Sequence, residues 1–231
     1  TLTGVISTGG GITGGSTATL PTISAGDGGG IWAIRNGYLL GPTAVARSAD
    51  LSVGPIDLSG INLRSTDLSG TNFTGATFAN NNVNGANFTN ATFTNIISGG
   101  GLVATPTAPT FAGPTTANYT VRGGFIVGPT VILSNQTLTN INLSNTVLTS
   151  ANFTSANLTN ATLTAADISG ANFTSATLAG VVSGQIVSPD AAAGALTLPA
   201  NFQLRGGFIV GPACNLSAAN LTNVDLSNVN L

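Results

Sequence analysis

Few residues in this chain could perform acid–base or nucleophilic chemistry. The 231 residues include no His, Glu, Lys or Met; the seven acidic residues are all Asp, and the five basic residues are all Arg. A general acid or base would therefore have to be an Asp or a Tyr. Asp57 and Asp67 form the candidate pair, but they lie ten residues apart. That separation is half a turn of the coil that the repeats predict, so we expect opposite faces, no catalytic site and no enzyme activity.

The other polar candidates also have structural interpretations. Asp167 and Asp225 occupy a recurrent Asp/Asn position, where a bond from the side chain to nearby backbone is expected. Cys214 is the single cysteine, so it cannot form an internal disulfide, and we expect a packed thiol. No carboxylate cluster indicates a metal site, and no cofactor is predicted. Trp32, Tyr38 and Tyr119 are expected to cover the coil rather than to bind sugar.

A nine-residue motif recurs three times, as IRNGYLLGP, VRGGFIVGP and LRGGFIVGP, and its arginines are Arg35, Arg122 and Arg205. Its paired glycines could suggest a phosphate-binding loop, but such loops need wider glycine spacing and a following helix. No helix is predicted here. We therefore expect a strand that enters the coil, with Arg capping carbonyl groups and Gly allowing close backbone approach.

A five-residue period positions most of these residues. Each unit has an apolar residue at its centre and usually a small residue two positions earlier, with Asn, Thr, Ser or Gly elsewhere. The centres form three blocks: Leu58, Leu63, Leu68, Phe73, Phe78, Val83, Phe88 and Phe93; Leu133, Leu138, Leu143, Leu148, Phe153, Leu158, Leu163, Ile168, Phe173 and Leu178; and Leu216, Leu221, Leu226 and Leu231. At the chain's 42% apolar content, chance would give this pattern with odds of roughly one in 10⁸.

Neither a helix nor a flat strand keeps a five-residue period on one face. A coil that turns a corner once per unit would point every centre inward. Four units then close a square turn of 20 residues, and successive turns pair as parallel strands about 4.8 Å apart. The sequence predicts an all-β solenoid with these centres as its core.

The units Ala-Asn-Phe-Thr-Ser, Ala-Asn-Leu-Thr-Asn and Ala-Asp-Ile-Ser-Gly resemble the pentapeptide repeat family. The resemblance implies a right-handed quadrilateral β-helix, and its handedness comes from the resemblance alone. Asn81 and Gln136 depart from the pattern, because each stands where a small inward residue belongs. We expect them at corners or bent outward.

The arginine motif, the five-residue units and a Pro/Gly-rich connector together form a longer module. We predict the end of a preceding module and a connector over 1–30, module 1 over 31–97, a connector over 98–118, module 2 over 119–182, a connector over 183–201 and a truncated module 3 over 202–231. Gly54-Pro55 inserts two residues into the frame. We expect the connectors to be extended and to pack along or between coils.

Composition excludes several classes of protein. Only 5% of the residues are charged, against about 25% in an ordinary soluble domain. The net charge of −2 offers no attraction to nucleic acid. No apolar run approaches the roughly 18 residues that span a bilayer, so no membrane insertion is predicted. Twelve Asn-x-Ser/Thr sites occur, but the repeat itself generates them, so glycans are possible but not favoured.

The leading functional hypothesis is a non-enzymatic structural protein that forms a homo-oligomer or filament, outside the cell or on a cell or virion surface. The modules are similar to those of large repetitive surface proteins of microbes and big viruses. The chain opens on TLTGVIS, and Leu231 lies inside a unit, so we expect open coil ends that pair with another copy. One alternative is an ice-binding or other surface-binding β-helix. Another, implied by the family, is a DNA mimic that binds a topoisomerase, for which seven Asp against five Arg are not acidic enough.

Overall fold

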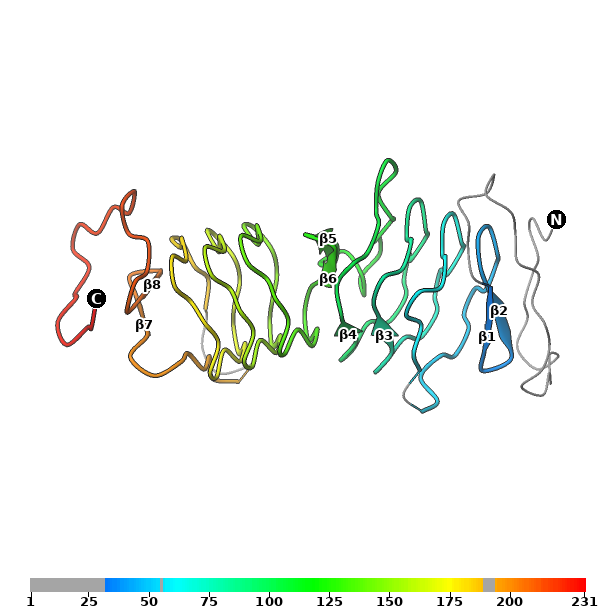
Figure 1. Ribbon diagram of the computed structural model, residues 1–231, viewed down its shortest axis with the longest axis horizontal. Helices are drawn as coiled ribbons and strands as arrows, with labels where there is room; N and C mark the ends of the chain where they lie inside the picture. The colour runs from blue at the N-terminus through cyan, green and yellow to red at the C-terminus, as the bar shows by residue number, and fades with distance from the viewer. Residues whose placement is uncertain (1–31, 55, 189–193) are drawn as a thin grey trace. The chain divides into compact units, whose positions relative to one another are not determined.

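The protein is known from a computed structural model, which describes residues 32–54, 56–188 and 194–231 (Figure 1). Contacts divide the chain into two compact units, Thr1–Ile126 and Val127–Leu231. The segment predicted as 1–30 lies outside the described residues, as does residues 189–193 of the connector predicted over 183–201. No described helix is long and apolar enough to cross a membrane.

Both units are built from coils with a 20-residue turn. In the second unit, Ile132 forms a parallel bridge with Asn152, and Asn152 forms the next bridge with Asn172. The first unit has the same register between Asn62 and Asn82. Phe153 N donates to Asn172 O at 2.7 Å, and Asn152 N donates to Val131 O at 2.9 Å, so neighbouring coils satisfy each other's backbone. The predicted turn of four five-residue units is confirmed.

The two-residue insertion at Gly54-Pro55 is visible in the ladder of the first unit. Before it, Val45 pairs with Asp67 and Asp50 pairs with Asn72, each 22 residues apart. After it, Asp57 pairs with Thr77, 20 residues apart. The coil therefore absorbs the insertion as a wider corner and then returns to its regular register.

Each corner depends on the last residue of a unit. Ala156 N donates to Phe153 O at 2.9 Å, which closes a turn around Thr154 and Ser155. Ser155 has φ 58°, and Asn160 in the next unit has φ 57°. This left-handed region suits Gly, Asn and Ser better than larger side chains, which explains why those residues fill the position.

The arginine motifs form hairpins, although we expected single strands. β1 (Ala33–Arg35) pairs with β2 (Tyr38–Leu40), β5 (Thr120–Arg122) with β6 (Phe125–Val127), and β7 (Gln203–Arg205) with β8 (Phe208–Val210). β1–β2 and β7–β8 are antiparallel. Both residues of each intervening turn have positive φ, namely 48° and 80° at Asn36-Gly37, 53° and 82° at Gly123-Gly124, and 51° and 80° at Gly206-Gly207. These are the signs of a type I′ turn, whose twist matches that of a hairpin.

The remaining named strands and the connectors extend the coils. β3 (Thr77–Phe78) and β4 (Ile97–Ser98) pair in parallel, 20 residues apart. In the first connector, Val103 pairs with Asn82 and Thr110 with Asn87. In the second, Thr197 pairs with Asn172. The connectors are therefore extended and lie along the preceding coil, as predicted.

Candidate binding site

The predicted core residues of the first two blocks all lie inside the coils. Their exposed fractions are at most 1% at Leu58, Leu63, Leu68, Phe73, Phe78, Val83, Phe88, Phe93, Leu133, Leu138, Leu143, Leu148, Phe153, Leu158, Leu163, Ile168, Phe173 and Leu178. The third block differs, because Leu216, Leu221 and Leu226 are only half-buried. No coil among the described residues covers their outer side, so they are not the closed core that we predicted.

Aromatic rings fill the axis of both units. Phe153 and Phe173, one turn apart, stack with ring centroids 4.7 Å apart and planes 4° apart. In the first unit, Phe93 lies 5.2 Å from Tyr119. Tyr119 and Trp32 are 8% and 3% exposed, respectively, so these two aromatic residues pack against the coil rather than forming a sugar-binding platform.

Asn81 points inward, so the expectation that it bends outward was wrong. Its side chain is fully buried, and Nδ2 donates to Leu58 O at 2.6 Å and to Ile61 O at 3.0 Å. Two carbonyl acceptors inside the coil therefore replace the water that a buried amide would lose. Gln136 is half-buried, and its Nε2 reaches Ser134 O at 3.4 Å.

The recurrent Asp/Asn position bonds to local backbone as predicted. Asp167 Oδ1 accepts Ser169 N at 3.0 Å, and Asp225 Oδ1 accepts Ser227 N at 2.8 Å. Asn157 makes the same bond to Thr159 N at 3.0 Å. These carboxylates and amides therefore shape corners and do not converge on a common centre.

The arginine prediction holds for one motif of three. Arg35 Nε donates to Asp57 O at 2.7 Å, and so it caps a carbonyl of the coil. Arg122 is exposed, with no hydrogen bond or ion pair among the described residues. Arg205 Nε is buried without a partner. The common feature of the motifs is thus the hairpin, not the arginine contact.

Asp57 and Asp67 have separate partners. The pKa of Asp57 is lowered, chiefly by hydrogen bonding to Ser59. Burial raises the pKa of Asp67, but hydrogen bonds from Arg47 and Ser69 outweigh it, so the net shift is downward. The Arg47 Nε–Asp67 Oδ2 distance is 2.6 Å. Both carboxylates are held in the ionised form, which suits neither of them to act as a general acid near neutral pH.

Cys214 is a half-buried thiol at the start of the last coil. Burial raises its pKa to about 11, although its backbone bond to Gly211 opposes the shift. The thiolate is the reactive form of cysteine, so Cys214 is a poor nucleophile.

The hairpins dock on the preceding coil in the same way in both units. Ile126 N donates to Ser98 Oγ at 2.9 Å, and Leu102 N donates to Gly124 O at 2.9 Å. In the second unit, Ile209 N donates to Ser183 Oγ at 2.9 Å. Ile186 N donates to Gly207 O at 3.0 Å. We call each of these two arrangements a hairpin clasp.

A glycine beside each serine receives the aromatic residue of the hairpin. A Cβ atom added to Gly184 would lie 3.0 Å from the Phe208 ring, and one added to Gly100 would lie 2.7 Å from the Phe125 ring. The clasps were missed in the sequence, although two signals were present. One is the two-residue Asn-Gly or Gly-Gly turn between apolar runs, and the other is the Ser-Gly pair that ends each preceding block.

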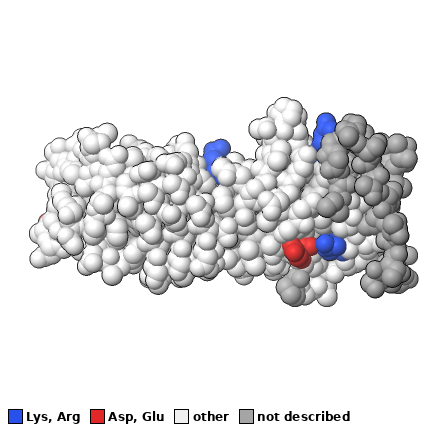
Figure 2. Space-filling view, in the orientation of Figure 1, with Lys and Arg blue, Asp and Glu red and all other residues white. Residues whose placement is uncertain are grey.

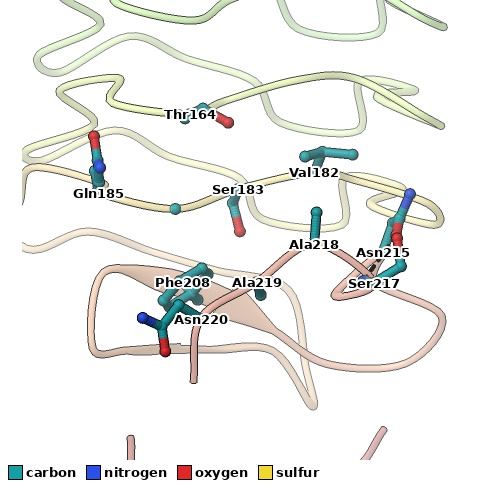
Figure 3. A pocket seen from close by; sticks show the side chains of 11 residues that line it. Thr164, Val182, Ser183, Gln185, Phe208, Asn215, Ser217, Ala218, Ala219 and Asn220 are labelled. Carbon is teal, nitrogen blue, oxygen red and sulfur yellow. Dashed lines mark hydrogen bonds between the residues drawn. The ribbon is translucent and has the colours of Figure 1, made fainter. Parts of the chain in front are cut away.

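A pocket of about 350 Å³ borders the second clasp (Figure 3). Val182, Ser183 and Gln185 line one side, on the last turn of the complete coil. Phe208 of β8 and the last coil line the other, the latter through Asn215, Ser217, Ala218, Ala219 and Asn220. Its walls carry amides, hydroxyls and apolar groups but no titratable side chain. Among the described residues no cluster of His, Cys, Asp or Glu could hold a metal. The pocket can therefore bind by shape and hydrogen bonding.

A sequence model of pentapeptide repeats matches eight copies in the chain, over residues 56–95, 133–164, 156–182 and 213–231. These are the segments whose 20-residue ladders and inward centres are described above. This chain belongs to the pentapeptide repeat family. The family fold is the right-handed quadrilateral β-helix, and pentapeptide repeat proteins are generally non-enzymatic structural or binding proteins.

Several solved pentapeptide repeat proteins are similar to the chain. Rfr23 of the cyanobacterium Cyanothece is 21% identical over 63% of this chain and 64% of its own, with a TM-score of 0.20. The plasmid-mediated fluoroquinolone resistance protein QnrB1 is 17% identical over 68% and 82%, with a TM-score of 0.30. HetL of the cyanobacterium Nostoc, involved in regulating heterocyst differentiation, is 20% identical over 67% and 72%, with a TM-score of 0.19. The chain thus spans less than two thirds of Rfr23. No curated protein sequence matches it.

Proposed function

We propose that the chain is a non-enzymatic structural protein, whose coils associate with further copies into a fibre or a layer on a cell or virion surface. The observation that carries this proposal is the nearly uncharged surface of the coils. Residues 133–182 contain a single charged residue, Asp167. Figure 2 shows a face on which charged side chains are few and isolated. Such a surface lacks the repulsion between like charges that keeps soluble proteins apart.

The sides of the coils offer flat rows of small polar groups. Thr137 bridges to Asn157, and Asn157 bridges to Thr177, so the three side chains form a row across successive coils. All three are exposed. A row of this kind can pack against another coil without burying an unpaired charge.

The last coil supports contacts along the axis. Asn215 pairs with Val182, but residues 216–231 form no bridge to another coil within the described part of the chain. Their backbone bonds close turns, such as that from Ala219 N to Leu216 O at 3.0 Å. An unpaired strand edge beside half-buried leucines is a template for pairing with a further coil.

The two alternatives have less support. The exposed row that could order water is interrupted by Asn157 between Thr137 and Thr177. A DNA mimic needs a dense acidic surface, and the face in Figure 2 shows no acidic stripe.

The proposal is tested by placing charge on the exposed row. The double variant Thr137→Lys, Thr177→Lys should lower the apparent mass measured by light scattering and leave the unfolding midpoint unchanged, because both side chains face water. Thr137→Gln with Thr177→Gln is the control for added bulk, and it should associate like the wild type. Equal masses for all three proteins, at low and high salt, would remove the lateral contact from the proposal.

A further inference from the structure

Residues 202–231 form a block whose internal contacts join its hairpin to its coil. Gln203 Nε2 donates to Asn228 O at 3.1 Å. A Cβ atom added to Gly206 would lie 2.7 Å from Val224, so the hairpin turn touches the coil that follows it. At the start of the block, the Phe202 ring packs on Gly211. The hairpin and the last coil can therefore move as one element.

A narrow seam attaches this block to the rest of the second unit. The second clasp supplies two bonds, from Ile209 N to Ser183 Oγ and from Ile186 N to Gly207 O. Two more run from Gly180 N to Ala213 O at 2.7 Å and from Asn215 N to Val181 O at 3.0 Å. The pocket of about 350 Å³ lies in the same seam, between Ser183–Gln185 and residues 215–220. The block is thus bonded in register but incompletely packed.

A short turn connects the block to the coil beneath it. Thr197 is fixed to that coil, because its N donates to Ala171 O at 3.0 Å and its O accepts Phe173 N at 2.7 Å. Only residues 198–201 lie between Thr197 and the block. Phe202 N donates to Pro199 O at 3.1 Å, and Asn201 has φ 69°. A non-glycine residue in the left-handed region costs about 1–2 kcal/mol, and the residue before a proline prefers an extended conformation. Short hinges of this kind favour exchange of an element between copies.

We propose that residues 202–231 exchange between molecules, so that the block of one copy occupies the Ser183 clasp of a second copy. This inference rests on the proposed self-association and gives it a mechanism. Opening the 198–201 turn breaks the four seam bonds, and docking on a neighbour restores the same four. The equilibrium between closed and exchanged forms is therefore set by protein concentration and by relief of the hinge.

Disulfide trapping tests the exchange in the full chain. A Cβ atom added to Gly207 would lie 3.5 Å from the Gln185 Cα, which is within disulfide range. One population carries Gln185→Cys and the other Gly207→Cys, both with Cys214→Ala. The two are unfolded together, refolded and oxidised. Exchange predicts a disulfide-linked heterodimer that contains one chain of each kind.

Matched variants make the result decisive. The double variant Gln185→Cys, Gly207→Cys in one chain should form an internal bond, which verifies the geometry. Replacing Gln185→Cys by Thr174→Cys, an exposed residue outside the seam, measures random cross-linking. Three glycines inserted after Pro199 should reduce the heterodimer fraction several-fold by removing the hinge strain.

The possible outcomes separate the exchange from the proposed function. An internal bond in the double variant with no heterodimer above the Thr174→Cys background would overturn the exchange. If the wild type still associates by light scattering in that case, self-association stands and uses another contact. A heterodimer that never grows beyond two chains would uphold the exchange and contradict the fibre.

Discussion

Ser183 Oγ accepts the backbone N–H of Ile209 at 2.9 Å, across 26 residues of sequence. The same bond joins Ser98 and Ile126 in the first unit, also at 2.9 Å. Ser98, Ile126 and Ile209 are fully buried, and Ser183 is 7% exposed. A hairpin of two short strands is marginal by itself, so these serines help to fix where each hairpin docks.

Ser183→Ala should therefore destabilise the second unit. The change leaves the buried Ile209 N–H without an acceptor, which costs about 1–3 kcal/mol. Urea unfolding should show a lower midpoint. Ser144→Ala is the matched control, because its hydroxyl makes no hydrogen bond among the described residues, and it should change the midpoint little. Equal midpoints for the two variants would show that the clasp does not hold the hairpin.

Phe153→Asp should prevent folding of the second unit. The ring is fully buried and stacks on Phe173, so the substitution places an unpaired carboxylate on the axis, where the cost of burial is severe. Thr154→Asp, the neighbouring residue at a solvent-facing corner, should be nearly silent. Circular dichroism during heating measures both. An unchanged melting temperature for Phe153→Asp would contradict the inward register.

Ala165→Gly should raise stability, which is unusual for a substitution by glycine. Ala165 has φ 55° at a corner that Asn, Ser or Gly fills in most other units. Relief of the left-handed strain is worth roughly 1 kcal/mol after the entropy cost of glycine. Ala161→Gly should instead lower stability, because Ala161 is fully buried beside the axis. If both changes destabilise equally, the corner strain is absent.

Stability should be flat from about pH 5 to 8, because the chain has no histidine. The pKa values of Asp50, Asp57, Asp67 and Asp225 are lowered in the folded state. Their contribution is therefore complete above the unfolded pKa of about 3.9 and is lost as the pH falls through the lower folded values. Urea midpoints at pH 2 to 7 measure this loss. A midpoint that rises on acidification below pH 4 would contradict it.

Cys214 adds a loss of stability at alkaline pH. Burial raises its folded pKa to about 11 from a model value of 9.0. The favourable term is thus present below about pH 9 and is lost as the pH approaches 11. Cys214→Ala should flatten the part of the alkaline loss that the two tyrosines do not cause. Identical alkaline profiles for both proteins would show that the thiol is not buried.

The coil was predictable because its rule is local and repeated. Every unit needs an inward centre and a corner residue that tolerates positive φ, and residues such as Phe153 and Ser155 state both requirements in the sequence. The clasps were not predicted, because the Ser183–Ile209 bond depends on a hairpin that returns to a coil 26 residues earlier. Asn81 was also misplaced, since its polarity suggested an outward position and the Leu58 and Ile61 carbonyls that accept it become visible only in the fold.

The mass of the wild-type chain as a function of concentration tests the central claim, that these coils self-associate, most directly. Static light scattering from dilute to concentrated solution, with electron microscopy of the same samples, gives the measurement. The structural proposal predicts a mass that rises with concentration and images of filaments or sheets. A single population at the 22.7 kDa mass of one chain at every concentration, with no ordered assembly, would contradict it.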